Sequence, residues 1–195
     1  MTRILAATLV AATLGVTPAL AQDQAAPADG AVDLTASLPF DTEVRQTSVD
    51  ALQATVYDLI ALRQVAHQAH WNVVGSDYYQ LHEFYEELYT DVGGYIDGAA
   101  ERIRSLSVPA DGRNAATAEN TLVDEGDLAE MTGAETLQAL YGNWATVANT
   151  LHERIDATED DLITQDYLIG VSYTLDKELW QLHAHLQDGA LQAHQ

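Results

Sequence analysis

The sequence predicts an all-α fold, in which four long helices form a bundle and one long crossover joins the second helix to the third. Apolar residues recur at three- and four-residue spacings along four long stretches, which is the pattern of amphipathic helices. No stretch of alternating apolar and polar residues competes with these four as a strand. Two short connections flank one long polar connection, and helices joined by short connections pack as antiparallel neighbours.

The first two helices are expected to form a hairpin. The first is expected over residues 48–74, with Gly75 as its stop, and the second over residues 77–106, with Pro109 soon after it. The turn between them should be centred near Ser76. The apolar residues of the first helix that recur at helical spacing are Leu52, Val56, Leu59, Ile60, Leu62 and Ala66.

The crossover and the last two helices follow. Residues 107–131 are polar and contain Pro, Gly and Asn, so we expect a long connection with a short helical turn at residues 124–129. The third helix begins at Thr132, which makes a capping box with Glu135, and the fourth is expected over residues 162–187. This topology is the ferritin-like arrangement of a four-helix bundle. The apolar residues of these two helices are Leu137, Leu140, Trp144, Val147, Leu151, Leu168, Val171, Leu175, Leu179, Leu182 and Leu186.

The N-terminal residues have the pattern of a secretory signal peptide. Arg3 gives a basic start, residues 4–16 are an apolar run, and residues 19–21 read Ala-Leu-Ala, the small-residue pattern of a cleavage site. The apolar run is too short to cross a bilayer comfortably. We therefore expect a signal peptide at residues 1–21, export to a bacterial periplasm and no membrane association after cleavage. The alternative is an uncleaved membrane anchor.

The remainder of the chain divides into three parts. Residues 22–45 are rich in Ala, Asp, Gln and Pro and are expected to form a flexible acidic arm. Residues 46–188 contain the predicted bundle domain, and residues 189–195 form a C-terminal tail. Removal of the signal peptide takes away one basic residue, so the formal charge of −22 becomes −23.

The charge and the absence of cysteine exclude several classes of function. The chain has 30 acidic residues against 8 Lys and Arg, and Lys177 is its one lysine. Binding a phosphate backbone requires clustered Lys and Arg, so DNA is not expected as a partner. Without cysteine, disulfide scaffolds, thiolate zinc sites and cysteine nucleophiles are excluded. An acidic surface is common in soluble proteins, and it also attracts cations.

Four metal-ligating residues share one face of the second predicted helix. At about 100° per residue they fall within an arc of about 100° around the helix axis; they are His82, Glu86, Asp97 and Glu101. Glu86 and Asp97 are about 16 Å apart along the axis, whereas the ligands of one ion lie about 2 Å from it. A single copy of the helix therefore cannot gather all four around one site.

A second copy of the chain brings these residues together. If this helix packs antiparallel against its copy about a two-fold axis near residues 91 and 92, His82 lies beside the partner's Glu101. The same symmetry sets Glu86 beside the partner's Asp97. An isologous dimer would thus contain two identical sites, each shared between the subunits.

Two glycines lie close to the expected axis. Inside a helix, Gly93 and Gly94 each lower the stability of the helix by about 1 kcal/mol relative to Ala. Close approach of two paired helices is one reason to keep them, and local tolerance without a purpose is the other.

His70 completes the candidate site. It and His82 are equidistant from Ser76 in the sequence, so they should face each other across the hairpin. Each residue alone has an ordinary alternative, as a solvated helix charge or as a core histidine. Together, two imidazoles and three carboxylates suit Fe(II) or a similar divalent metal. In the candidate site, one chain supplies His70, His82 and Glu86. The other chain supplies Asp97 and Glu101.

At these residues the sequence resembles the Dps family (DNA protection during starvation), the mini-ferritins. The matching segments read His-Trp-Asn-Val-Val-Gly at 70–75, Leu-His-Glu-x-x-Glu-Glu-Leu-Tyr at 81–89 and Asp-Gly-Ala-Ala-Glu-Arg-Ile at 97–103. A fourth segment reads Leu-Asp-Lys-Glu-Leu-Trp at 175–180. The resemblance covers roughly residues 46–188.

The resemblance implies a subunit of a hollow dodecamer with a di-iron ferroxidase centre across each dimer two-fold. Family members oxidise Fe(II), usually with hydrogen peroxide, and store the ferric mineral inside. Glu86 stands where many members have Asp, and the other family ligands are matched by His70, His82, Asp97 and Glu101. The family function is therefore expected here: an iron-storing ferroxidase that limits oxidative damage. The alternatives are a periplasmic buffer for divalent metals without redox turnover and a nucleoid protein.

Residues beside the predicted ligands have open interpretations. Trp71 follows a ligand and Trp180 matches a family aromatic, so each serves either to intercept oxidising equivalents or to pack in the core. His67 lies one turn before His70 and is either an outer partner of the site or a polar core residue.

Two further groups of polar residues have looser placements. Acidic residues line three-fold pores in the family, and a solvated charged turn is the alternative for the candidates Asp156, Glu159, Asp160, Asp161 and Asp166. Surface or packing roles are expected for the C-terminal histidines, and weak metal binding is the alternative: His183, His185 and His194.

Overall fold

The computed structural model describes residues 38–127 and 129–192, with side chains as far as residue 187. The predicted signal peptide at residues 1–21, on which the prediction of export rests, lies outside the described residues. The predicted arm up to residue 37 and residues 193–195 of the predicted tail, including His194, also lie outside them.

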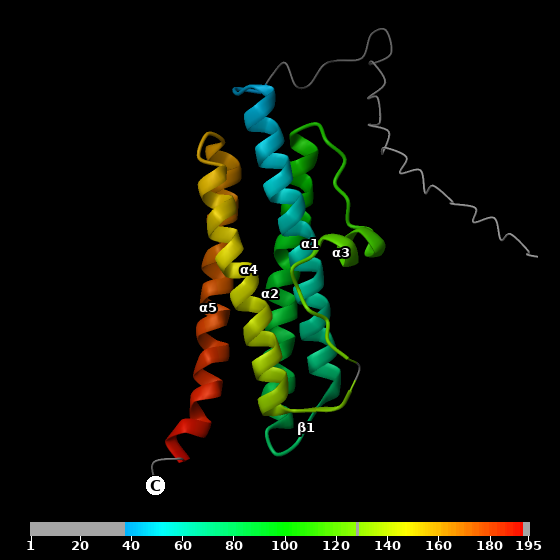
Figure 1. Cartoon of the computed structure of the whole chain (residues 1–195), viewed down its shortest axis with the longest axis vertical. Coiled ribbons are helices and arrows are strands. Elements are labelled where there is room, and N and C mark those ends of the chain that lie inside the picture. Colours follow the sequence, from blue (N-terminus) through cyan, green and yellow to red (C-terminus); the bar gives the residue numbers. More distant parts are fainter. Residues whose placement is uncertain (1–37, 128, 193–195) are drawn as a thin grey trace, which may run out of the picture. The chain divides into compact units, whose positions relative to one another are not determined.

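Helices α1 and α2 form the predicted hairpin (Figure 1). α1 spans Thr42–Asn72 and α2 spans Tyr78–Ser105. α1 begins earlier than predicted because the Asp41 carboxylate accepts hydrogen bonds from the N–H groups of Glu43 and Val44 and caps the helix there. In the turn, Gly75 has a φ of +117°, which side chains rarely allow, so a glycine makes the reversal possible.

The crossover contains one short helix, α3, at Asn114–Asn120. The predicted helical turn at residues 124–129 was wrong, because the described residues of that stretch are not helical. Instead, the Asn143 side chain of the next long helix accepts a hydrogen bond from the Asp124 N–H and donates one to the Asp124 carbonyl, both at 2.9 Å. With both backbone groups of Asp124 bonded to a side chain, this residue is held in an extended segment.

Two short strands also occur, which the sequence did not predict. β1 at Val73–Val74 and β2 at Met131–Thr132 pair in parallel, with Val73 beside Met131. Each strand has only two residues, too few for an alternating pattern to show in the sequence. The pair joins the end of the crossover to the hairpin turn.

Helices α4 and α5 complete the bundle (Figure 1). α4 spans Gly133–Ala157 and α5 spans Leu162–Gln192. The capping box is confirmed, since the Thr132 hydroxyl accepts the Glu135 N–H while the Glu135 carboxylate accepts the Thr132 N–H. α1 packs against α2 and α4, and α5 packs against α4 and α2. The predicted ferritin-like bundle is therefore confirmed, with α3 lying in the connection between α2 and α4.

The core lies between the four long helices, and the predicted apolar stripes face it. A buried ion pair crosses this core, with Arg154 Nη2 of α4 at 2.6 Å from Asp58 Oδ2 of α1. The Asp58 carboxylate also accepts hydrogen bonds from the Thr121 hydroxyl and the Leu122 N–H, so it holds the crossover against the bundle. Within residues 38–127 and 129–192, no helix is long and apolar enough to cross a membrane.

Candidate metal centre

His70 and His82 face each other across the α1–α2 hairpin, as predicted. His70 Nδ1 lies 2.7 Å from the His82 carbonyl oxygen, and His82 Nδ1 lies 2.8 Å from the His70 carbonyl oxygen. The two imidazole rings stack with their centroids 3.6 Å apart. Each histidine thus uses the other's backbone to fix the orientation of its ring.

This reciprocal pairing determines which nitrogen of each ring can bind a metal. A carbonyl oxygen can only accept a hydrogen bond, so Nδ1 carries the proton in both rings. In the neutral imidazole the other nitrogen, Nε2, then has a free lone pair. A backbone carbonyl that holds the far nitrogen is the usual outer partner of a metal-bound histidine. The pair is therefore prepared to donate two Nε2 ligands.

Glu86 lies one turn after His82 on α2, and its side chain is exposed. Burial and the Glu86 carboxylate raise the pKa of Tyr89. The pKa of His67 is lowered by burial and by the charges of His70 and Arg63, whereas Glu86 acts in the opposite direction. These effects show that Glu86 lies near Tyr89 and His67, the aromatic neighbours of His70.

Asp97 and Glu101 lie on later turns of α2, and both are exposed. The described part of the chain contains no group of three or more His, Asp or Glu side chains that could hold a metal ion. The structure therefore brings His70 and His82 together and leaves these two carboxylates apart from them within one chain. This is the distribution that a site shared between two chains requires.

The centre of α2 coincides with the two-fold axis expected from the sequence. α2 spans Tyr78–Ser105, so its midpoint falls between Asp91 and Val92. Gly94 is exposed there, and a Cβ added to it would meet no described atom within 4 Å. A Cβ on Gly93 would meet the Arg63 side chain at 3.4 Å, an ordinary contact. Packing among the described residues therefore gives no reason for a glycine at position 94.

An aromatic cluster lies beside the histidine pair. The His67 ring lies between Trp71 and Tyr89, with centroid distances of 4.0 and 4.4 Å. His67 is half-buried in this cluster, so it is not a fully buried core residue. Trp71 is 56% exposed and Trp180 is 66% exposed. The interpretation that these tryptophans pack in the core is therefore wrong within one chain.

One of the proposed pore residues has a structural role instead. Asp161 is buried, and both of its oxygens lie 2.9 Å from Arg102 Nη2. The Thr164 hydroxyl also donates to Asp161. A carboxylate engaged in this way inside the subunit does not line an open pore, so its assignment to the acidic pore group was wrong. Asp156, Glu159, Asp160 and Asp166 are exposed, as are His183 and His185.

Glu178 is a buried acid that the sequence analysis missed. It is 1% exposed, and its Oε2 accepts a hydrogen bond from Trp144 Nε1 at 2.7 Å. Its Oε1 has no hydrogen-bond partner among the described residues. Burial raises the pKa of Glu178 to about 8. The signal was present in the sequence, because Glu178 follows Leu175 by three positions and precedes Leu182 by four, on the core face of α5.

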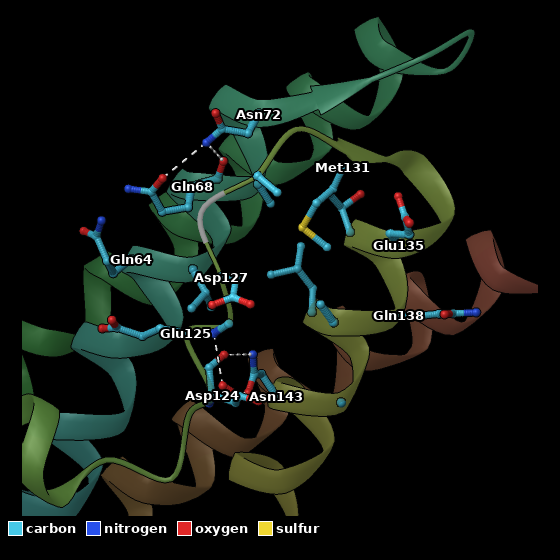
Figure 2. Close-up of a pocket in the computed structure, with 18 of the residues that line it drawn as sticks. Gln64, Gln68, Asn72, Asp124, Glu125, Asp127, Met131, Glu135, Gln138 and Asn143 are labelled. Atoms are coloured by element: carbon cyan, nitrogen blue, oxygen red, sulfur yellow. Dashed lines mark hydrogen bonds between the residues drawn. The ribbon is translucent and has the colours of Figure 1, made fainter.

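A groove of about 870 Å³ lies beside the crossover, away from the candidate ligands. Figure 2 shows amide side chains of α1, among them Gln64, Gln68 and Asn72, opposite α4, with the crossover between them. The crossover supplies carboxylates such as Asp124 and Asp127. None of the five predicted site residues lines this groove.

Comparisons with known proteins place the chain in a family. The sequence profile of the ferritin-like domain matches residues 49–191. A DNA protection during starvation protein of Brevibacillus brevis is 31% identical over 148 residues, which cover 75% of this chain and 99% of that protein. DNA protection during starvation protein 2 of Deinococcus radiodurans is 35% identical over 75% of this chain, but the match spans only 61% of its length.

A solved structure agrees with this assignment. The Dps of Microbacterium arborescens, solved in its high iron form, is 32% identical and superposes with a TM-score of 0.71, over 77% of this chain and 99% of that one. A family profile that spans most of the helical bundle and a full-length relative at this identity both match the fold described above. The chain therefore belongs to the ferritin-like family and, within it, to the Dps proteins.

Proposed function

We propose that this chain is the subunit of an iron-storing ferroxidase whose metal sites are shared between two chains. Each site takes His70, His82 and Glu86 from one subunit, with the partner's Asp97 and the partner's Glu101. The observation that carries the proposal is the reciprocal pairing of the two imidazoles, which leaves both Nε2 atoms free.

The donor set fits two ferrous ions as substrate. Imidazole and carboxylate ligands together suit Fe(II), and two-metal sites commonly hold their ions about 3.5–4 Å apart. The centroid distance of 3.6 Å between the stacked imidazoles is compatible with one Nε2 ligand for each ion. The Dps of Microbacterium arborescens was solved in a high iron form, which supports iron as the metal.

Hydrogen peroxide is the oxidant that we propose. Each of two Fe(II) ions gives up one electron, and the O–O bond of one peroxide molecule breaks as it accepts both electrons. With two water molecules the products are two ferric oxyhydroxide units and four protons. Because the two electrons are used in one event, no hydroxyl radical is released, and the reaction removes both of the reagents that generate it.

The assembly that we propose is a closed dodecamer built from the α2–α2 dimer. Large apolar side chains are exposed along α5, including Ile169, Tyr173 and Trp180. Exposed apolar residues in this number are typical of surfaces that another subunit covers. A shell of subunits with a charge of −22 or −23 each would attract Fe(II) strongly.

The cellular location is a further part of the proposal. The basic start, apolar run and Ala-Leu-Ala pattern of residues 1–21 support export to a periplasm. The acidic charge and the single lysine, Lys177, argue against binding DNA, although relatives are named for DNA protection. A mobility-shift assay with duplex DNA at physiological salt should therefore show no complex.

Iron-dependent peroxide consumption tests the proposed function. Purified wild-type protein mixed with Fe(II) and hydrogen peroxide should consume about one peroxide for two iron ions and form a soluble ferric core. A double variant with His82→Ala and Asp97→Ala should oxidise iron about 100-fold more slowly, because each site loses a ligand from both chains. His183→Ala, which removes an exposed histidine of α5, is the matched control and should keep the wild-type rate.

Two outcomes would contradict the proposal. If the double variant oxidises iron as fast as the wild-type protein, the site lies elsewhere. If the wild-type protein binds Zn(II) or Fe(II) at equilibrium but consumes no peroxide, it is a divalent-metal buffer. Native mass spectrometry of the same samples measures the number of subunits, for which twelve is expected.

A further inference from the structure

Helix α5 contacts α2 at the turn that carries Asp97. The Tyr167 hydroxyl of α5 donates a hydrogen bond to the Tyr95 carbonyl oxygen at 2.5 Å. Tyr95 lies two residues before Asp97, within the same helical turn. A hydrogen bond from another helix therefore acts directly on the backbone that sets the direction of the Asp97 side chain.

Gly98 makes this contact possible. A Cβ added to Gly98 would lie 2.7 Å from the Tyr167 hydroxyl oxygen and 3.0 Å from its Cε2 atom. The first distance is shorter than a methyl group tolerates and the second is a tight contact, and the Tyr167 hydroxyl is itself held by its hydrogen bond. The space left by the missing side chain is therefore filled by the tyrosine ring, next to Asp97.

Electrostatics agrees with this proximity. Burial, with smaller contributions from the charges of Tyr95 and Asp97, raises the pKa of Tyr167 to about 12, whereas the hydrogen bond with the Ala99 N–H acts in the opposite direction. The hydroxyl consequently keeps its proton at neutral pH and remains a hydrogen-bond donor. Asp97 lies near enough to influence it, although Asp97 itself is exposed and free to reach a partner.

A second α2–α5 hydrogen bond provides an internal comparison. The Tyr95 hydroxyl and the Thr174 hydroxyl oxygens are 2.8 Å apart. This bond joins the same two helices, but it involves only side chains and touches no backbone atom of the Asp97 turn. Loss of this bond would weaken the helix contact without releasing the Tyr95 carbonyl.

We propose that Tyr167 is a positioning residue that holds the Asp97 turn of α2 in the orientation needed to present its carboxylate to the partner's histidine pair. This inference rests on the proposed function and deepens it. Each chain offers its Asp97 carboxylate to the histidine pair of the partner. Helix α5 fixes the turn that carries Asp97, through the Tyr167 hydroxyl and the space at Gly98.

Equilibrium binding of Co(II), a redox-stable substitute for Fe(II), tests the proposal on the assembled protein. Tyr167→Phe keeps the ring and removes only the hydroxyl. We expect its Co(II) affinity to fall about tenfold, the lower range of losses seen when outer partners of metal ligands are removed. The absorption spectrum of bound Co(II) should also change, because it reports ligand geometry. Gly98→Ala, which displaces the ring, should show the same two changes.

Thr174→Val is the matched control, because it removes the second hydrogen bond and keeps the side-chain shape. It should retain the wild-type affinity within about twofold and the wild-type Co(II) spectrum. Native mass and thermal midpoint identify any variant that fails to assemble. If Tyr167→Phe assembles and binds Co(II) with the wild-type affinity and spectrum, the positioning role is wrong. If the wild-type protein itself binds no Co(II), the proposed function fails first.

Discussion

The two ends of α2 are held by different means, although each carries one half of the candidate site. At the N-terminal end, His82 is fixed against His70 by reciprocal hydrogen bonds within the α1–α2 hairpin. At the C-terminal end, the turn of Asp97 is fixed by Tyr167 of α5. One half is thus completed inside the chain, while the other is oriented for use by another chain.

This difference indicates where assembly enters the chemistry. The histidine half needs no partner to acquire its geometry, because both imidazoles are already oriented. The carboxylate half has no ligand on its own chain to meet within the described residues. Variants of Gly94 at the dimer axis, of the ligands in the two halves of the site, and of the buried Glu178 should therefore affect assembly, iron oxidation and stability to different extents.

The largest effect is expected from closing the space at the axis. Gly94→Leu adds a side chain where the described chain leaves open space, so the monomer should fold, with a gain in helix propensity of about 1 kcal/mol. Between two paired α2 helices the same side chain would clash. We expect loss of the dimer and of all larger assemblies, and at least a 100-fold loss of iron oxidation. Native mass and peroxide consumption measure the two losses.

Gly142→Leu is the control for this variant. Gly142 is also exposed on a helix, α4, and a Cβ there would likewise meet no described atom within 4 Å. It should assemble and oxidise iron as the wild-type protein does. A Gly94→Leu protein that remains assembled and active would show that α2 does not pair closely at this point.

A smaller effect is expected when the two halves are damaged in different chains. His82→Ala and Asp97→Ala proteins should each be inactive alone. When the two are denatured together in equal amounts and refolded, random pairing gives about one quarter of sites an intact His82 and an intact partner Asp97. Recovery of about a quarter of the wild-type rate would demonstrate shared sites.

The result of mixing also excludes the opposite arrangement. If all ligands of a site came from one chain, the mixture would be as inactive as its two components. Each single variant refolded alone controls for the refolding step, and native mass confirms that mixed assemblies form.

The sequence predicted the long helices and the hairpin half of the site for physical reasons that act over short distances. The spacing of apolar residues predicted which face of each long helix is buried. The capping box of Thr132 and Glu135 predicted where α4 begins. His70 and His82 were found because they are mirrored about the turn. Such features depend on neighbours in the chain, so the pattern of residues records them.

The features that were missed depend on contacts between distant residues. α3 has no apolar stripe, and Thr117 is its one buried residue, so helical spacing could not reveal it. Tyr167 acts on Tyr95, 72 positions away, through a hydroxyl that carries no periodic signal. The glycine at position 98 is a local sign in the sequence that another element approaches this turn of α2 closely.

The smallest expected effect is on stability alone, and it comes from Glu178, the buried acid of α5 that accepts the Trp144 hydrogen bond. Burial raises the pKa of Glu178 from 4.5 to about 8, and the Asp91 carboxylate of α2 adds to the rise, while the Trp144 hydrogen bond and Lys177 oppose it. Between these two pH values the folded chain retains a proton that the unfolded chain has released. The free energy of unfolding should therefore fall as the pH rises through this window, by at most about 1.4 kcal/mol per pH unit.

Glu178→Gln should remove this dependence, because the amide stays neutral and its oxygen still accepts the Trp144 hydrogen bond. Relative to the wild-type protein, the variant should be more stable at pH 8, and the difference should shrink as the pH falls to 5. Thermal midpoints at matched protein concentration measure this difference. Asp166→Asn removes an exposed carboxylate from the same helix and is the matched control for the loss of one negative charge. A stability difference between Glu178→Gln and the wild-type protein that stays constant from pH 5 to pH 8 would mean that Glu178 is ionised in the folded chain. Iron oxidation should be unchanged in both variants, because neither side chain belongs to the half held by the hairpin or to the half held by Tyr167.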